Sequence, residues 1–241
     1  MPHFPFQRLQ ADLADLIAKT PAGFRLPSEP VLARQLGVSR ATLREAMRTF
    51  ETQGLIRRRQ GAGTYVVGKV PVFESGLEVL ESLQTIASRL NLDVTHGEVS
   101  IAEFKADPEH ASALKVPAGR QLVRVSRVIR ADSRPVAYLV DTLPEEVLHP
   151  EELTSKFNGS VLDYLLGRGD PLATSRADIS AINATAEVAK MLEVQRDDVL
   201  LQFVAKLYTV SGKVVDYSFS YFLPGYFKFH VVRRVGPLNN P

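Results

Sequence analysis

The sequence predicts an α+β protein of two domains, and three observations lead to this prediction. Residues 1–68 read as helices followed by a β-hairpin, whereas the rest of the chain mixes helices with several hairpins. Such mixing is typical of an antiparallel α+β sheet. The length of 241 residues suffices for two hydrophobic cores. We therefore expect a first domain over residues 1–68, a short linker over 69–74 and a second domain over 75–241.

The first domain is predicted to contain three helices. Five apolar side chains recur at helical spacing and predict an amphipathic first helix: Phe6, Leu9, Leu13, Leu16 and Ile17. A second, short helix is expected between Ser28, a candidate N-cap, and Gly37. A third is expected between Ser39, another candidate N-cap, and Gly54, which suits the residue after a helix C-cap.

The third helix carries Arg40, Arg44 and Arg48 at four-residue spacing, which places three guanidinium groups along one face. Like charges at this spacing cost about 0.2–0.5 kcal/mol per pair, so we expect a negatively charged partner to repay them. Arginine suits bidentate contacts with guanine edges and phosphates, and Ser39 and Thr42 add hydroxyl donors. The arrangement favours DNA as the partner.

A basic hairpin is expected directly after this helix. Residues 55–56 and 65–67 are short β-prone runs, and the loop between them contains three arginines and two glycines. A surface helix followed by an ordinary basic loop is the alternative interpretation. Capped helices, an arginine face and a basic loop together favour a winged helix that reads double-stranded DNA.

Residues 23–67 closely resemble the winged-helix domain of the GntR family of bacterial transcription regulators. The resemblance rests on a Leu-Pro-Ser-Glu turn at 26–29, a recognition-helix motif at 37–46 and an Arg-Arg-Gln-Gly-x-Gly-Thr wing at 58–64. Pro30 stands where family members usually carry an arginine. The resemblance implies a set of DNA-binding residues: Ser28, Ser39, Arg40, Thr42, Arg44, Arg48, Arg58, Gln60 and Gly61.

Composition narrows the functional classes. The chain is 45% hydrophobic and 23% charged, and its apolar runs are too short for a membrane span, so we expect a cytoplasmic protein. It contains no cysteine, which excludes disulfides and Cys-ligated zinc. The net charge is +5 over residues 1–68 and −3 over the remainder, so only the first domain suits phosphate binding.

Periodicity outlines the second domain. The predicted helices are residues 74–92, 108–114, 160–166 and 186–192. The predicted strands are residues 98–104, 121–130, 136–143, 176–182, 199–210 and 214–223. Two pairs of them form hairpins, one turning at Asp132-Ser133 and the other at Ser211-Gly212. An antiparallel sheet with helices packed on it is the expected architecture.

Residues 72–236 resemble the effector-binding UTRA domain of the HutC subfamily of GntR regulators, whose fold is similar to that of chorismate lyase. The motifs that carry the resemblance are residues 111–119, 125–137, 160–165 and 212–218. It implies a small-molecule pocket on one face of the sheet and dimerisation through this domain. The implied effector-binding residues are Arg127, Ser160, Asp216, Asp141 and Tyr221.

A physical argument supports part of this set. Ser160 is expected to cap a helix, and a helix N-terminus beside Arg127 would bind an anion. Alternatively, Arg127 and Asp216 pair as a structural bridge between strands. Subfamily members that bind phosphorylated sugars often carry a second arginine where this chain has Ile129, which argues against such a ligand. The aromatic residues between Tyr217 and Phe229 are interpreted as core and dimer packing.

The sequence thus predicts a metabolite-responsive one-component transcription regulator, a repressor that binds operator DNA as a homodimer and needs no cofactor. One alternative is a lyase-like enzyme, because the second domain shares a fold type with a lyase. No catalytic set supports it, and the five histidines are scattered without metal-ligand spacing. The other alternative is a DNA-binding protein without an effector, whose second domain serves only for dimerisation.

Overall fold

The computed structural model describes residues 4–59, 62–67, 72–153, 157 and 159–233. The chain divides into two compact units, Met1–Val72 with Leu223–Tyr226 and Phe73–Phe222 with Phe227–Pro241. Residues 69–71 of the predicted linker lie outside the described residues. Across the described ranges, no helix combines the length and the apolar character needed to cross a membrane.

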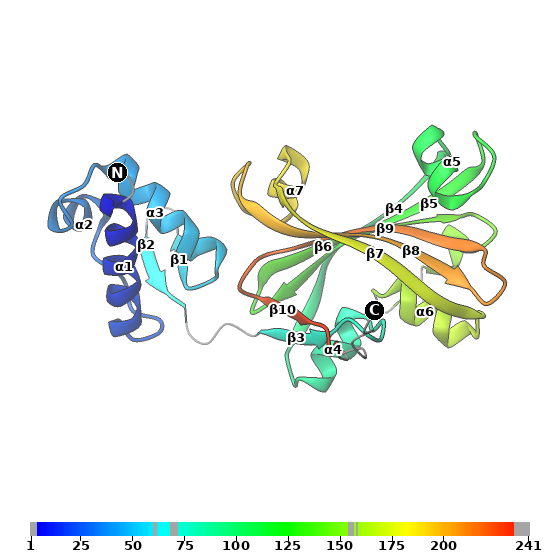
Figure 1. Ribbon diagram of the computed structural model, residues 1–241, viewed down its shortest axis with the longest axis horizontal. Helices are drawn as coiled ribbons and strands as arrows, with labels where there is room; N and C mark the ends of the chain where they lie inside the picture. Colours follow the sequence, from blue (N-terminus) through cyan, green and yellow to red (C-terminus); the bar gives the residue numbers. More distant parts are fainter. Residues whose placement is uncertain (1–3, 60–61, 68–71, 154–156, 158, 234–241) are drawn as a thin grey trace, which may run out of the picture. The chain divides into compact units, whose positions relative to one another are not determined.

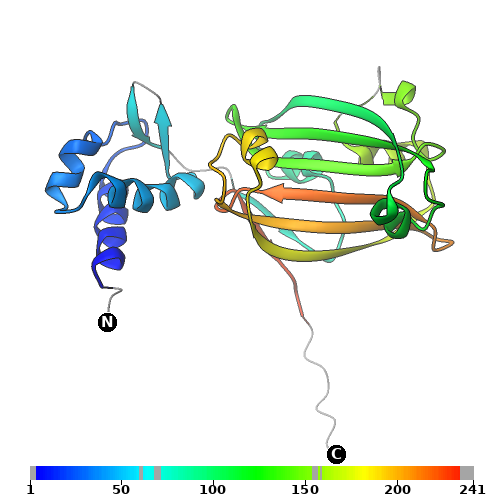
Figure 2. The ribbon, with the colours of Figure 1, turned by 90° about the horizontal axis from the view of Figure 1, so that it is seen from above.

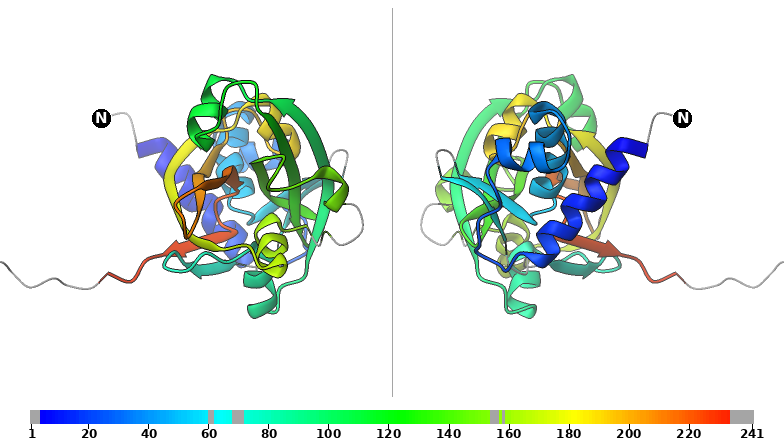
Figure 3. Two further views of the ribbon diagram at one scale, coloured as in Figure 1. Left: turned by 90° about the vertical axis from the view of Figure 1, so that its right-hand side faces the viewer. Right: turned by 90° about the vertical axis from the view of Figure 1, so that its left-hand side faces the viewer.

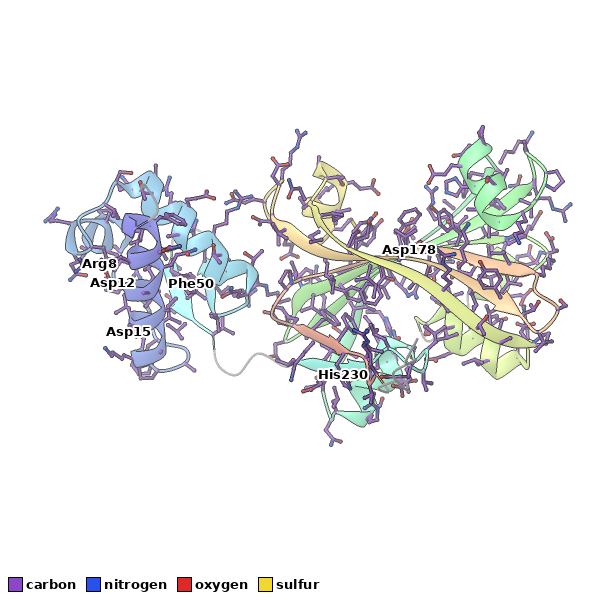
Figure 4. The ribbon with its side chains drawn as sticks, in the orientation of Figure 1. Arg8, Asp12, Asp15, Phe50, Asp178 and His230 are labelled. Atoms are coloured by element: carbon purple, nitrogen blue, oxygen red, sulfur yellow. The ribbon has the colours of Figure 1, made fainter. Side chains whose placement is uncertain are left out.

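The first unit contains the three predicted helices and the predicted hairpin (Figure 1). They are α1 (Phe4–Lys19), α2 (Glu29–Gln35), α3 (Arg40–Thr52), β1 (Ile56–Arg59) and β2 (Gly63–Val66), with β1 and β2 antiparallel. All three helices and the hairpin contribute apolar side chains to one core. From α3 these are Leu43, Ala46, Met47 and Phe50, the last of which is labelled in Figure 4.

Two of the three predicted helix signals in this unit are confirmed. The Ser39 hydroxyl oxygen accepts a hydrogen bond from the Thr42 backbone N–H at 3.1 Å, and Gly54 follows α3 with φ +74°. Ser28 occupies the N-cap position of α2, but its side chain makes no capping hydrogen bond, so that prediction is wrong. An N-cap side chain accepts from the second or third helical N–H, and at the second position Pro30 has none.

The second unit is built on a six-stranded antiparallel sheet in the order β4-β5-β6-β9-β8-β7 (Figure 2). The strands are β4 (Val94–Lys105), β5 (Gln121–Ala131), β6 (Arg134–Pro144), β7 (Leu172–Asn183), β8 (Val199–Thr209) and β9 (Val214–Phe222). The predicted strands and both hairpins are confirmed. Asp132 and Ser133, at the β5–β6 turn, both have positive φ, which two-residue hairpin turns require.

Helices cover both faces of this sheet (Figure 1). On one face lie α5 (Pro108–Leu114) and α7 (Ala186–Met191). On the other lie α4 (Leu83–Arg89), α6 (Val161–Arg168) and a parallel strand pair, β3 (Phe73–Gly76) with β10 (Phe227–His230). A short 3₁₀ helix, Pro150–Leu153, precedes α6. The end-on views in Figure 3 show how strongly the sheet twists.

The predicted helix over residues 74–92 is only partly present. Its first residues form β3, and the helix is confined to α4, which Ser82 caps with its side chain. The helical spacing was misleading because Leu77 and Leu80 are 40% and 52% exposed and pack no core. The pairing of β3 with β10 joins residues far apart in the chain, which local periodicity cannot reveal.

Strand alternation gives the sheet two different cores. Val123, Val125 and Leu143 point towards α6, whereas Leu122 and Tyr217 point towards α5. On the α6 face, the far end of the sheet is closed by aromatic rings, with Phe203 and Phe222 packing against Phe229 at centroid distances of 4.8 and 5.2 Å. Two apolar clusters therefore flank the middle of this face.

Candidate functional site

One candidate site is the outward face of α3. Leu43, Ala46, Met47 and Phe50 are buried, whereas Arg40, Thr42 and Arg44 are exposed. Ser39 holds the start of the helix, and its hydroxyl also lies 2.8 Å from that of Thr42. Among the described residues Arg40 forms no ion pair. The exposed hydroxyls and guanidinium groups form one continuous polar surface along the helix.

The arginines of this face have partners of their own. Arg44 Nε donates to Glu29 Oε2 at 2.6 Å, and Arg48 Nη1 lies 3.8 Å from Glu45 Oε2. The expectation that only an external anion repays their mutual repulsion is therefore wrong, because carboxylates of the same unit do so in part. The Arg44 side chain is still 55% exposed, so its guanidinium remains available to another anion.

Arg58, another predicted DNA contact, mainly joins the hairpin to α3. Its backbone N–H and its guanidinium both reach Glu51, at 3.1 and 3.4 Å. Its Nη2 also donates to the Arg44 carbonyl at 3.1 Å. These contacts fix the base of the hairpin against α3. Two other predicted contacts, Gln60 and Gly61, lie outside the described residues.

Sequence reasoning missed Arg25. This exposed residue forms an isolated β-bridge with Tyr65, and its guanidinium lies over Gly63 so closely that a Cβ there would collide with it. Gly63 has φ +112°, which also favours glycine. Arg25 thus adds a positive charge beside the hairpin. Local spacing gave no signal, because the neighbours of Arg25 come from β2, on the far side of two helices in the chain.

A second candidate site lies in the middle of the α6 face of the sheet. Arg127 on β5 donates from Nη1 to Asp141 Oδ2 on β6, and their side chains are only 6% and 13% exposed. Asp216 on β9 accepts a hydrogen bond from the Thr142 backbone N–H at 3.1 Å and is 5% exposed. One guanidinium and two carboxyl groups are thus buried together. We call Arg127, Asp141 and Asp216 the buried polar cluster.

The two carboxyl groups of this cluster differ in environment. Burial raises the pKa of Asp216 well above its usual value, and the charge of Asp141 and a hydrogen bond with it raise this pKa further. The Thr142 N–H and the Arg127 charge oppose the shift. The protonated form of Asp216 is therefore favoured, so that it shares a proton with Asp141 while Arg127 balances the remaining negative charge.

The structure changes the partner in the proposed structural bridge. Arg127 pairs with Asp141 across the β5–β6 hairpin, and the alternative pairing of Arg127 with Asp216 is wrong. The pairing leaves donors unused, because within the described residues the buried Arg127 Nε and Thr142 Oγ1 atoms have no hydrogen-bond partner. Buried polar atoms normally have partners, so these atoms point to a bound polar molecule.

Ser160 lies on the same face as the cluster. Its hydroxyl oxygen caps α6 by accepting from the Asp163 backbone N–H at 3.0 Å, as predicted. The Asp163 carboxylate in turn accepts from the Ser82 hydroxyl at 2.6 Å, which joins the starts of α6 and α4. The residue after Ser160, Val161, packs into the same core as Val123 and Val125.

Tyr221 does not belong to this site. On β9, Ser220 is in register with Leu139 and thereby with Arg127, whereas Tyr221 is in register with Tyr138. Since successive side chains of a strand alternate between faces, Tyr221 points to the opposite face, where its ring stacks on that of Tyr138 at 6.0 Å. The odd separation between Asp216 and Tyr221 on one strand was the available signal.

The aromatic residues near the C-terminus pack, as interpreted from the sequence, but on two faces. Phe222, Phe227 and Phe229 form mutual contacts on the face of the cluster, with centroid distances of 4.7 to 5.8 Å. Tyr217 and Phe219 form an edge contact at 4.9 Å and pack towards α5 on the other face.

Comparisons with known proteins agree with both sites. Residues 6–66 match the family model of bacterial regulatory proteins of the gntR family, and residues 89–228 match that of the UTRA domain. The chain belongs to the GntR family and carries a UTRA domain. The predicted family, the HutC-type organisation and the α+β fold are thereby confirmed. In this family the winged helix binds DNA and the UTRA domain binds a small-molecule effector.

Several curated relatives are repressors. The mannosyl-D-glycerate transport/metabolism system repressor MngR of Escherichia coli is 29% identical over 239 residues, covering 97% of this chain and 98% of the relative. The histidine utilization repressor of Pseudomonas aeruginosa is 28% identical over 197 residues, covering 80% and 76%. Among solved structures, PhnF from Mycobacterium smegmatis has a TM-score of 0.65 at 21% identity, covering 95% and 100%, which shows the shared fold.

Proposed function

We propose that this GntR-family regulator is a cytoplasmic repressor without catalytic activity, which binds operator DNA as a homodimer and is released by a small polar effector. The observation that carries the proposal is the α3 face, where Arg40, Thr42 and Arg44 are exposed on a helix whose opposite side is buried. Curated relatives that match almost the whole chain are named repressors, which supports the direction of regulation.

The structure suggests different roles for the predicted DNA-binding residues. Ser39, Arg40, Thr42 and Arg44 are exposed at the start of α3, and we assign them to bases and phosphates. Arg48 and Arg58 are only 23% exposed and each is near a carboxylate, so we assign them mainly to positioning. Ser28, freed from capping, keeps an exposed hydroxyl for a phosphate contact, while Gln60 and Gly61 remain predicted wing contacts.

We assign the effector to the buried polar cluster and the adjacent start of α6. The free Nε donor of Arg127 calls for an acceptor oxygen, whereas the Asp141–Asp216 pair calls for a hydroxyl or an amine. Ser160 lies at the helix start on the same face. The ligand class that fits is a small molecule carrying both kinds of group. Ile129, with no charge to offer, continues to argue against a phosphorylated sugar.

The test of the DNA site is a titration of promoter DNA with the intact protein and with Arg40→Ala. We expect the variant to bind specific DNA about 1–3 kcal/mol more weakly while keeping its melting temperature, because an exposed side chain is removed. Arg8→Ala is the matched control, since Arg8 is exposed on α1 (Figure 4) and its loss removes the same charge. Equal affinities of all three proteins would contradict the assignment of α3.

The test of the effector site is a thermal-shift screen of the intact protein against carboxylates, amino acids and sugars. A ligand that binds only the folded state stabilises it by RT ln(1 + [L]/Kd), so a saturable rise in melting temperature identifies a binder. The binder should also release promoter DNA. A binder that the protein converts to another compound would instead support an enzyme, and binding without any effect on DNA would contradict an effector role.

A further inference from the structure

One edge of the sheet in the second unit is unusually open. β7 is the last strand in the sheet order and pairs only with β8 (Figure 2). It is twelve residues long, and its burial pattern contains no buried residue on either face. The outer edge of such a strand presents backbone N–H and C=O groups that another strand could pair with, a feature that proteins normally protect.

The opposite edge strand, β4, carries two protective features. A β-bulge lies between His96 and Val99, which interrupts regular pairing. The strand also carries the acidic Glu103 and has no lysine or arginine before its last residue, so its charges cannot complement themselves. β7 has its only irregularity at one end, between Leu172 and Thr174. A regular, largely exposed run follows, from which a second strand could extend the sheet.

The charges on β7 are arranged so that the strand complements itself. Arg176 and Asp178 stand two residues apart on one face, with side chains 77% and 76% exposed, and their nearest charged atoms are 3.6 Å apart. Figure 4 labels Asp178 on this strand. Across the β7–β8 pair, Arg176 is in register with Lys206, a like charge. Within its own subunit Arg176 therefore faces a cation directly and reaches a carboxylate only along the strand.

We propose that β7 is the surface through which two copies of this chain dimerise, by pairing antiparallel with itself about Ala177. This inference rests on the proposed function for the existence of a dimer and adds where its interface lies. In this register Arg176 is opposite the partner subunit's Asp178, and two-fold symmetry repeats the pair. Ser175 is then opposite the partner subunit's Ile179, which covers an isoleucine that is 46% exposed in the single chain.

Several features favour this occupant over an unrelated peptide. An antiparallel pairing about Ala177 satisfies the outer backbone groups of both strands at once and places opposite charges in direct contact twice. The neighbouring side chains are small, among them Ala173, Ala181 and Ser180, so that two strands can approach without clashes. A continuous sheet then passes through both subunits, which removes the open edge.

The test uses charge reversal in the full-length protein, followed by sedimentation equilibrium. Arg176→Asp places two acids opposite two acids in the symmetric dimer, and Asp178→Arg places two arginines opposite two arginines. We expect each single variant to weaken dimerisation roughly tenfold or more, because two attractive pairs become repulsive. Glu103→Arg, on the other edge strand, is the matched charge reversal and should leave the dimerisation constant unchanged.

Two rescue experiments make the test specific. The doubly substituted protein, Arg176→Asp with Asp178→Arg, has its charges exchanged and should regain the wild-type dimerisation constant. An equimolar mixture of the two single variants should form a heterodimer, since each arginine then faces an aspartate. Rescue excludes misfolding as the cause of the loss, because each single variant is folded if the mixture recovers.

Other outcomes overturn the inference in distinguishable ways. Single variants that dimerise as tightly as the wild type would place the interface elsewhere, while operator binding by the same proteins would leave the proposed function intact. A wild-type protein that is monomeric, both alone and on promoter DNA, would reject the interface together with the dimer. Loss in the single variants without rescue by the double substitution or by the mixture would reject the register about Ala177.

Discussion

The α3 face and the buried polar cluster both depend on arginine, but they use it in opposite ways. Arg40 and Arg44 are exposed, and the single Glu29 that binds Arg44 still leaves most of its surface to solvent. Arg127 is buried and is matched with two carboxyl groups in the free protein. An exposed arginine costs little while it waits for a large anion, whereas a buried one must be balanced before any ligand arrives.

The largest effect should come from removing the buried cation. Arg127→Ala leaves Asp141 and Asp216 buried with no positive charge, and we expect a loss of about 3–5 kcal/mol in the free energy of unfolding of the second unit. Chemical denaturation measures it. Arg120→Ala is the control, because Arg120 and its partner Glu146 are 48% and 38% exposed, and such a pair contributes less than about 1 kcal/mol. Equal losses in the two variants would erase the contrast between buried and exposed arginines.

A pH-dependent effect should follow at the buried carboxyl pair. Because the pKa of Asp216 is raised in the folded state, the folded protein keeps a proton that the unfolded chain releases above about pH 3.9. Ionisation of the unfolded chain then favours unfolding, so this group lowers stability progressively as the pH rises from that value towards the folded-state pKa.

Asp216→Asn removes this effect, since an amide does not titrate and its oxygen can still accept from the Thr142 N–H. We expect the variant to melt at a higher temperature than the wild type at pH 8, with the difference shrinking towards pH 4. Melting curves across this range measure it. A difference that is constant with pH would show that Asp216 is ionised in the folded protein.

A smaller effect should separate the two serines of the first unit. Ser39→Ala removes a capping hydrogen bond from α3 and should cost about 1 kcal/mol of stability. Ser28→Ala removes a side chain that makes no capping bond, and we expect almost no change. Thermal denaturation of both variants gives the comparison. If Ser28→Ala were as costly as Ser39→Ala, the absence of a cap on α2 would be refuted.

The smallest effect should come from the carboxylate beside the exposed arginine. Glu29→Ala frees the Arg44 guanidinium and removes a negative charge from the DNA-facing side, so DNA affinity should rise, by less than about 1 kcal/mol. The gain should decrease with salt, as screening predicts. Titrations at two salt concentrations check it. Weaker binding would mean that Glu29 orients Arg44 for DNA rather than competing with it.

Local signals made most of the fold predictable. Ser39 and Gly54 bound α3 because capping depends on a few neighbouring residues. The turn at Asp132-Ser133 fixes the β5–β6 register and brings Arg127 close to Asp141, so that their pairing could have been read from the hairpin. The pairing of β3 with β10 could not, because the whole six-stranded sheet lies between these strands in the chain.

The same distinction applies to the candidate site. Arg127 and Asp141 come from one hairpin, but Asp216 arrives from a strand whose place in the sheet no local pattern states. Its position decides that the cluster has two acids for one base. The side of the sheet on which Tyr221 lies follows from strand alternation alone, yet a list of similar residues conceals it.

The proton that Asp216 shares with Asp141 gives the effector site a chemical memory of what enters it. A ligand that brings an ammonium group favours two ionised carboxylates and drives the proton into solution, whereas a neutral hydroxyl leaves it in place. In calorimetry, the heat of binding would depend on the ionisation enthalpy of the buffer in the first case and not in the second. Two buffers at one pH would thus report whether the signal molecule is an amine before its structure is known.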